Sequence, residues 1–98
     1  MNRHGDLLFA VSDFLNLSRE EEEYIEMKIA LSNYFQALRK KKNLTQMQVA
    51  MKIKSSQSRV AKIERAESSV SLDLIVRSII ALGSTKKEIG KVMLAKTA

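Results

Sequence analysis

The chain lacks the residues on which several kinds of protein site depend. It has no cysteine, which excludes a disulfide framework and a thiolate metal site. It has no proline, three glycines and a single histidine, His4. It has no glycine-rich phosphate loop and no His/Asp/Glu cluster with metal-ligand spacing. We therefore expect neither an enzyme nor a cofactor or metal site.

A long hydrophobic run is also missing from the 98 residues. No apolar stretch approaches the roughly 18 residues that a transmembrane helix needs, and residues 1–14 hold no signal-peptide cleavage site. The length suits one domain. We expect no membrane partner and a cytoplasmic location, associated with the nucleoid if the partner is DNA.

Charge is distributed unevenly. Residues 1–35 carry three basic and seven acidic side chains, whereas residues 36–98 carry fourteen basic and four acidic ones. A compact basic region favours a polyanionic partner, with nucleic acid ahead of an anionic membrane. Because basic charge also serves solubility alone, the charge by itself does not establish a nucleic-acid partner.

Apolar residues recur at spacings of three and four, which predicts an all-α protein. Ser18 with Glu21, Thr45 with Gln48, and Thr85 with Glu88 have the spacing of capping boxes. We expect an N-terminal extension, residues 1–17, with a short helix over 6–16. A domain over 18–98 follows, built as a compact bundle of five helices: 18–42, 46–53, 57–65, 72–82 and a last helix from 86.

The first long helix contains a candidate apolar seam. We expect its core-facing residues at spacings of three and four: Tyr24, Met27, Leu31, Tyr34 and Leu38. Asn43 is expected to end this helix in the left-handed conformation, and Gly83 suits the same place after residues 72–82.

The two short helices at 46–53 and 57–65 predict a helix-turn-helix. Val49, Ala50 and Ile53 are the buried candidates of the first, and small Ala50 allows the close approach that a sharp turn requires. On the second, Val60, Ile63 and Glu64 share one face. Its opposite face is polar and basic, as expected of a helix that lies in the DNA major groove: Ser58, Ala61, Lys62 and Arg65, flanked by Gln57 and Arg59.

The stretch LTQMQVAMKIKSSQSRVAKIERAE, residues 44–67, resembles the helix-turn-helix of the lambda repressor and Cro type, the XRE family. The motif itself spans about 45–65, and the wider resemblance runs over about 31–83. Three positions depart from the family pattern. Lys54 and Ala66 stand where the family often has glycine, and Ser55 stands where it often has an apolar residue. A left-handed Lys54 would be strained by about 1 kcal/mol.

The resemblance also implies a structural ion pair between Arg39 and Glu64. The helical wheel places Glu64 on the inward side, and a buried carboxylate needs a partner. The alternative is two exposed charges.

The resemblance further implies two sets of DNA contacts. Gln57 would bond adenine, Lys62 guanine and Ala61 a thymine methyl group, while Arg59 suits either a base or a phosphate. The alternative for Arg59 and for Lys62 is solvated surface. The base set is Gln57, Ser58, Arg59, Ala61 and Lys62, and the phosphate set is Thr45, Gln46, Lys52, Lys54 and Arg65.

Repressors of this type act as homodimers on double-stranded DNA. The candidates for the dimer surface are Ile89, Val92 and Met93 of the last helix, and the acidic N-terminal part, which comprises residues 7–17 and the early turns of the first long helix. Core packing explains most of these side chains better. A second function is also open. The segment DFLNLSREEEEYIEMKIAL, residues 13–31, resembles the leader of XRE-type antitoxins. Such an antitoxin would bind a small basic RNase-type toxin and repress its own operon.

Overall fold

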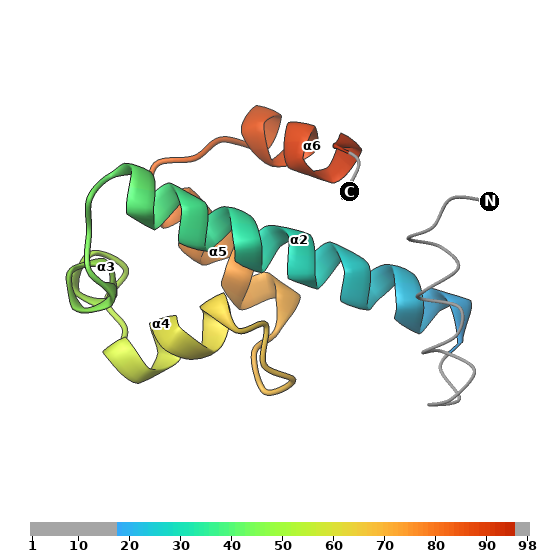
Figure 1. The fold of residues 1–98 in the computed structure, drawn as a ribbon, viewed down its shortest axis with the longest axis horizontal. Coiled ribbons are helices and arrows are strands. Elements are labelled where there is room, and N and C mark those ends of the chain that lie inside the picture. Colours follow the sequence, from blue (N-terminus) through green and yellow to red (C-terminus); the bar gives the residue numbers. More distant parts are fainter. Residues whose placement is uncertain (1–17, 96–98) are drawn as a thin grey trace.

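The computed structural model describes residues 18–95, and every regular element in that part of the chain is a helix (Figure 1). The expected extension and its short helix lie outside the described residues. The predicted all-α fold is confirmed. The helices are α2 (Arg19–Lys41), α3 (Gln46–Lys52), α4 (Gln57–Glu64), α5 (Leu72–Ala81) and α6 (Lys86–Leu94).

A serine or threonine begins each of these helices. Its side-chain oxygen accepts a hydrogen bond from the backbone N–H three residues later, and such a cap contributes about 0.5–2 kcal/mol. The complete reciprocal box forms at Thr45 and at Thr85. The box predicted at Ser18 is only half formed, because the Glu21 carboxylate accepts from the Ser18 hydroxyl. The caps are Ser18, Thr45, Ser56, Ser71 and Thr85.

Helices α2 to α5 share one kind of C-terminal end. Each is followed by a residue with a left-handed backbone, and the next N–H donates to the carbonyl five residues earlier, as in a Schellman motif. These bonds run from Leu44 to Arg39, Ser55 to Ala50, Glu67 to Lys62 and Ser84 to Ile79. Only one of the four left-handed residues is a glycine: Asn43 (φ 56°), Lys54 (φ 56°), Ala66 (φ 52°) and Gly83 (φ 101°).

The core is assembled from α2 to α5 and the loop between α4 and α5. Helix α6 lies on the other side of α2 from α3 and α4 (Figure 1). Its half-buried side chains Ile89, Val92 and Met93 pack against the core. These dimer candidates therefore have a core role. The buried hydrophobic residues are Leu31, Phe35, Val49, Ala50, Val60, Ile63, Val70, Ile75, Ile79 and Leu82.

The predicted seam of α2 is wrong at its N-terminal end. Tyr24 and Met27 are 44% and 40% exposed, because the first turns of α2 extend beyond the α3–α5 body (Figure 1). The buried face instead includes Lys28 and Ser32. Lys28 tolerates this position because its Nζ donates to the Glu67 carbonyl at 2.8 Å.

Candidate nucleic-acid interface

Helices α3 and α4 pack closely and are joined by residues 53–56. Ala50 on α3 is 1% exposed, and Val49 and Val60 are fully buried. Lys54 turns the chain with its left-handed backbone, and Ser56 then caps α4 by accepting from the Arg59 N–H at 3.1 Å. The turn therefore lies where the sequence places it.

The outer side of α4 is polar and begins at its first turn. Gln57, Ser58 and Arg59 are exposed, whereas Ala61 and Lys62 are half-buried. The inner side is held by Val60 and Ile63, both fully buried. The base-contact residues inferred from the sequence thus lie together along one helix.

The residues inferred to contact phosphate surround this helix. Thr45, Lys52 and Lys54 are exposed on α3 and in the turn, and Gln46 is half-buried at the start of α3. Arg65 is exposed at the end of α4, but its Nη2 pairs with Glu67 Oε2 at 2.6 Å. A phosphate must therefore compete with Glu67 for Arg65.

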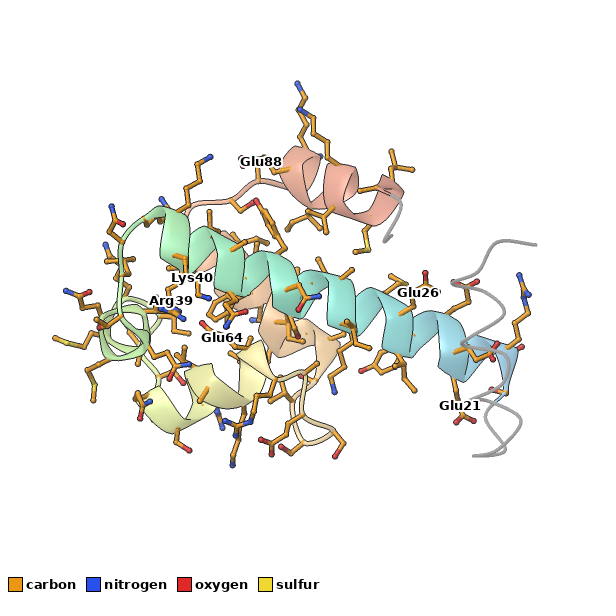
Figure 2. All side chains as sticks on the ribbon, viewed as in Figure 1. Glu21, Glu26, Arg39, Lys40, Glu64 and Glu88 are labelled. Atoms are coloured by element: carbon orange, nitrogen blue, oxygen red, sulfur yellow. The ribbon has the colours of Figure 1, made fainter. Side chains whose placement is uncertain are left out.

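Arg39 on α2 and Glu64, the last residue of α4, form a buried ion pair (Figure 2). The Arg39 Nε donates to Glu64 Oε2 at 2.5 Å, and Nη2 donates to Oε1 at 3.0 Å. The Arg39 and Glu64 side chains are 13% and 3% exposed. They are therefore not the two exposed charges of the alternative interpretation. The remaining Arg39 nitrogen, Nη1, donates to the Leu44 carbonyl at 2.9 Å. Arg39 on α2 thus bonds both to α4, through Glu64, and to the connection between α2 and α3, through the Leu44 carbonyl.

Two glutamines complete the surroundings of the Glu64 carboxylate. Gln46 Nε2 donates to Oε1 at 3.1 Å, and Gln36 Nε2 donates to the same atom at 3.3 Å. Burial alone would raise the pKa of Glu64, but the hydrogen bonds from Arg39 and Gln46 and the charge of Arg39 outweigh it. The pKa of Glu64 is therefore held below its ordinary value. The hydrogen bond to Glu64 also raises the pKa of Arg39.

Sequence reasoning missed the contacts of both glutamines with Glu64. Gln36 lies one turn before Arg39 on α2, a spacing that places both on the same face. That spacing could have identified Gln36. Gln46 was assigned only to phosphate, yet its Oε1 also accepts from Gln57 Nε2 at 2.8 Å. The glutamine at the start of α3 therefore connects Glu64 to the first residue of α4.

Neither a metal-binding cluster nor a membrane-spanning helix is found between residues 18 and 95. No group of three His, Cys, Asp or Glu side chains there could hold a metal ion. No helix in this part of the chain is long and apolar enough to cross a membrane.

Comparison with known proteins identifies the family to which this arrangement of helices belongs. A model of the helix-turn-helix family matches residues 35–89, from the last two turns of α2 to the first turn of α6. The chain belongs to the helix-turn-helix family of the lambda repressor and Cro type. This family's domain binds DNA and regulates transcription, so the chain is a DNA-binding transcription regulator. No curated protein and no solved structure matches the chain.

Proposed function

We propose that the chain is a sequence-specific repressor that inserts α4 into the DNA major groove. One observation carries the proposal. The first turn of α4 exposes Gln57, Ser58 and Arg59, while Val60 and Ile63 anchor the opposite side in the core. A rigidly held helix with an exposed polar first turn is what base reading in the major groove requires.

Each side chain on the outer side of α4 has a chemical preference. Gln57 can form a bidentate contact with adenine N6 and N7, and Lys62 can donate to guanine O6 or N7. Ser58 bonds several bases, and the methyl group of Ala61 suits a thymine methyl. Arg59 reaches a base or the neighbouring phosphate. Of the five, Gln57 has the most defined geometry, because Gln46 already holds its amide.

The phosphate contacts would fix the position of α4 in the groove. Lys52 and Lys54 supply exposed positive charge at the end of α3. The Thr45 hydroxyl accepts from the Gln48 N–H, which leaves its own hydrogen for a phosphate oxygen. Gln46 lies at the start of α3 and Arg65 at the end of α4. The proposed phosphate contacts therefore lie at both ends of the α3–α4 pair.

A homodimer is the expected binding unit, because one such domain covers only a half-site. The test is selection of bound sequences from random duplex DNA at a stated salt concentration. We expect a two-fold symmetric site whose half-sites lie about one helical turn apart. Equal retention of all sequences would contradict sequence-specific repression.

One structural observation favours a second function, that of an antitoxin. The first turns of α2 extend past the α3–α5 body (Figure 1) and carry Glu20, Glu21, Glu22 and Glu23 beside the exposed Tyr24. An acidic surface with an exposed aromatic suits a basic protein partner. Co-purification with a small basic protein encoded next to this chain supports the function. Recovery of the chain only as a monomer or homodimer counts against it.

A further inference from the structure

The exposed lysines between residues 18 and 95 have no carboxylate partner there, whereas most of the arginines do. The arginines that form ion pairs in this part of the chain are Arg19, Arg39, Arg65 and Arg77. Some of the exposed lysines lie on α3 and in its turn, beside the helix proposed to read DNA. The others, apart from Lys40, form a second group at the end of α2 and on α6, which we call the lysine surface: Lys41, Lys42, Lys86, Lys87 and Lys91.

The two halves of the lysine surface meet at the turn between α5 and α6. Lys42 directly follows α2, and its Nζ lies 3.7 Å from the position that a Cβ atom on Gly83 would occupy. Lys41 shares a face of α2 with Tyr34, two turns earlier, and the Tyr34 hydroxyl forms a hydrogen bond with the Ser84 hydroxyl at 2.7 Å. Since this turn leads directly into α6, the lysines of α2 lie next to those at the start of α6.

Helix α6 turns its own lysines away from the core. Ile89, Val92 and Met93 pack inward. At 100° per residue, the direction opposite to these three side chains contains Lys87 and Lys91. Both lysines are exposed. The outer side of α6 is therefore the positively charged side.

The charge of the lysine surface is poorly compensated. The acidic residue of α6, Glu88, is held at the start of the helix, where its Oε1 accepts from the Thr85 N–H at 3.0 Å and from the Thr85 hydroxyl at 3.1 Å. Ammonium groups gathered in one area repel one another. A polyanion lowers this repulsion by neutralising them, so the lysine surface suits a polyanionic partner.

The residue types of the lysine surface indicate which polyanion fits. Lysine contacts a phosphate as a point charge. Single-stranded nucleic acid is bound largely through aromatic side chains that stack on its bases. The exposed aromatic residue between residues 18 and 95 is Tyr24, near the opposite end of α2. Lysines without a stacking aromatic suit the phosphate backbone of a duplex, and the chain is already a DNA-binding protein.

The lysine surface and the outer side of α4 face in different directions. Helix α2 lies between α4 and α6 and contacts both (Figure 1). Val60 and Ile63 turn the inner side of α4 toward the core, so its outer side faces away from α2. Helix α6 turns its lysines away from α2 on the other side. Duplex DNA is stiff over about 150 base pairs, so a duplex bound along α4 does not reach the lysine surface without bending sharply.

We propose that the lysine surface binds the phosphate backbone of a second DNA duplex while α4 binds the first. The protein then joins two duplexes, or two distant parts of one DNA molecule. Binding of the second duplex has no base preference, because phosphates carry no sequence information. The inference takes from the proposed function only that α4 contacts the first duplex, and it adds a separate surface on the other side of α2.

The experiment measures capture of a second duplex. The duplex that the wild-type protein retains most strongly in selection is immobilised on beads, loaded with protein, and given a fluorescent duplex of unrelated sequence at the same salt concentration. The test variant combines Lys87→Gln with Lys91→Gln. The matched control combines Arg19→Gln with Arg77→Gln, which removes the same charge from exposed positions outside the lysine surface.

We expect the lysine variant to bind the first duplex as the wild type does. Its capture of the second duplex should be weaker on the order of 10-fold, because each protomer loses two phosphate contacts. The plot of log capture against log salt should also become less steep by about two units per protomer. The arginine control should capture the second duplex as the wild type does.

Three results would overturn the inference. In the first, the lysine variant captures the second duplex fully, so that two α4 helices of a dimer join the duplexes. In the second, the arginine control loses capture equally, so that only net charge matters. In the third, the wild type captures no second duplex; sedimentation with phosphatidylglycerol vesicles would then assign the lysine surface to a membrane. Capture of the second duplex without any sequence preference for the first would instead support the lysine surface and refute the proposed repressor.

Discussion

At Lys54 and Ala66 the backbone adopts a conformation that favours glycine. Their φ angles are 56° and 52°, whereas the equivalent turn after α5 uses Gly83. A side chain in this region costs on the order of 1 kcal/mol, because Cβ approaches the carbonyl oxygen. The Schellman bonds after α3 and α4 hold these residues in place despite the strain.

Lys54→Gly should therefore stabilise the protein by up to about 1 kcal/mol, since relief of strain exceeds the added freedom of the unfolded chain. Thermal unfolding measures the effect, and about 1 kcal/mol corresponds to roughly 4–8 °C for a domain of this size. Lys52→Gly is the matched control, because Lys52 is the last helical residue of α3 and glycine at a helical position should destabilise by up to about 1 kcal/mol. A clear loss of stability in Lys54→Gly would show that the turn is placed wrongly.

Among the elements, α2, α3 and α4 meet at the Arg39–Glu64 pair. Arg39→Ala should destabilise the protein by about 3–5 kcal/mol, because it leaves the Glu64 carboxylate buried without its cation. Chemical denaturation measures the free energy of unfolding. Arg77→Ala is the control: Arg77 pairs with Asp73 on α5, but both side chains are more than 70% exposed, so the change should cost under about 1 kcal/mol. An unchanged free energy of unfolding in Arg39→Ala would exclude the pair from any structural role.

The same pair predicts how stability depends on pH. The pKa of Glu64 is lower in the folded protein than in the unfolded chain, since hydrogen bonds from Arg39 and Gln46 outweigh its burial. The folded protein thus gains stability from Glu64 above the unfolded pKa, and this gain is lost as the pH falls through the folded pKa. Unfolding free energies measured from neutral to acidic pH should decrease more steeply for the wild type than for Arg39→Ala. Parallel curves for the two proteins would contradict the assignment.

Arg65, at the end of α4, pairs with Glu67. This pairing predicts that the Glu67 carboxylate weakens DNA binding by competing with phosphate for Arg65. Glu67→Gln should free Arg65 for phosphate, strengthen binding, and steepen the plot of log affinity against log salt by about one unit per protomer. The backbone contact of Lys28 with the Glu67 carbonyl remains. Glu23→Gln is the matched control, because Glu23 pairs with Arg19 at the far end of α2. Equal effects of the two changes would mean that only net charge matters.

The features of these helices that the sequence predicts are local ones. Caps, left-handed ends and the apolar face of α4 depend on residues within one or two turns, so they follow from spacing. The buried Lys28 could not be predicted, because its partner carbonyl lies 39 residues away on a loop. Gln36 and Gln46 meet Glu64 across 28 and 18 residues. Such contacts depend on how the helices pack. The spacing of Gln36 from Arg39 places the two on one face of α2, but it does not give the contact with Glu64.

For the whole molecule, the contacts proposed with phosphate set the salt dependence of binding. If Lys52 and Lys54 of both protomers each neutralise one phosphate while Arg65 stays paired with Glu67, log affinity should fall against log salt with a slope of about −4. Titrations of the selected site at several salt concentrations measure it. A slope near zero would mean that these cations do not contact phosphate.

The ends of α2 carry opposite charge: glutamates occupy its first turn, and Arg39, Lys40 and Lys41 occupy its last turn (Figure 2). A helix of 23 residues separates them by roughly 30 Å. The charged side chains of α2 therefore contribute an electric dipole directed along this helix. In the negative field of DNA, the dipole turns the lysine end inward and the glutamate end outward before any contact forms. If α4 is the helix that binds DNA, as proposed above, we expect the protein to approach DNA in a preferred orientation, with the acidic end of α2 free in solution.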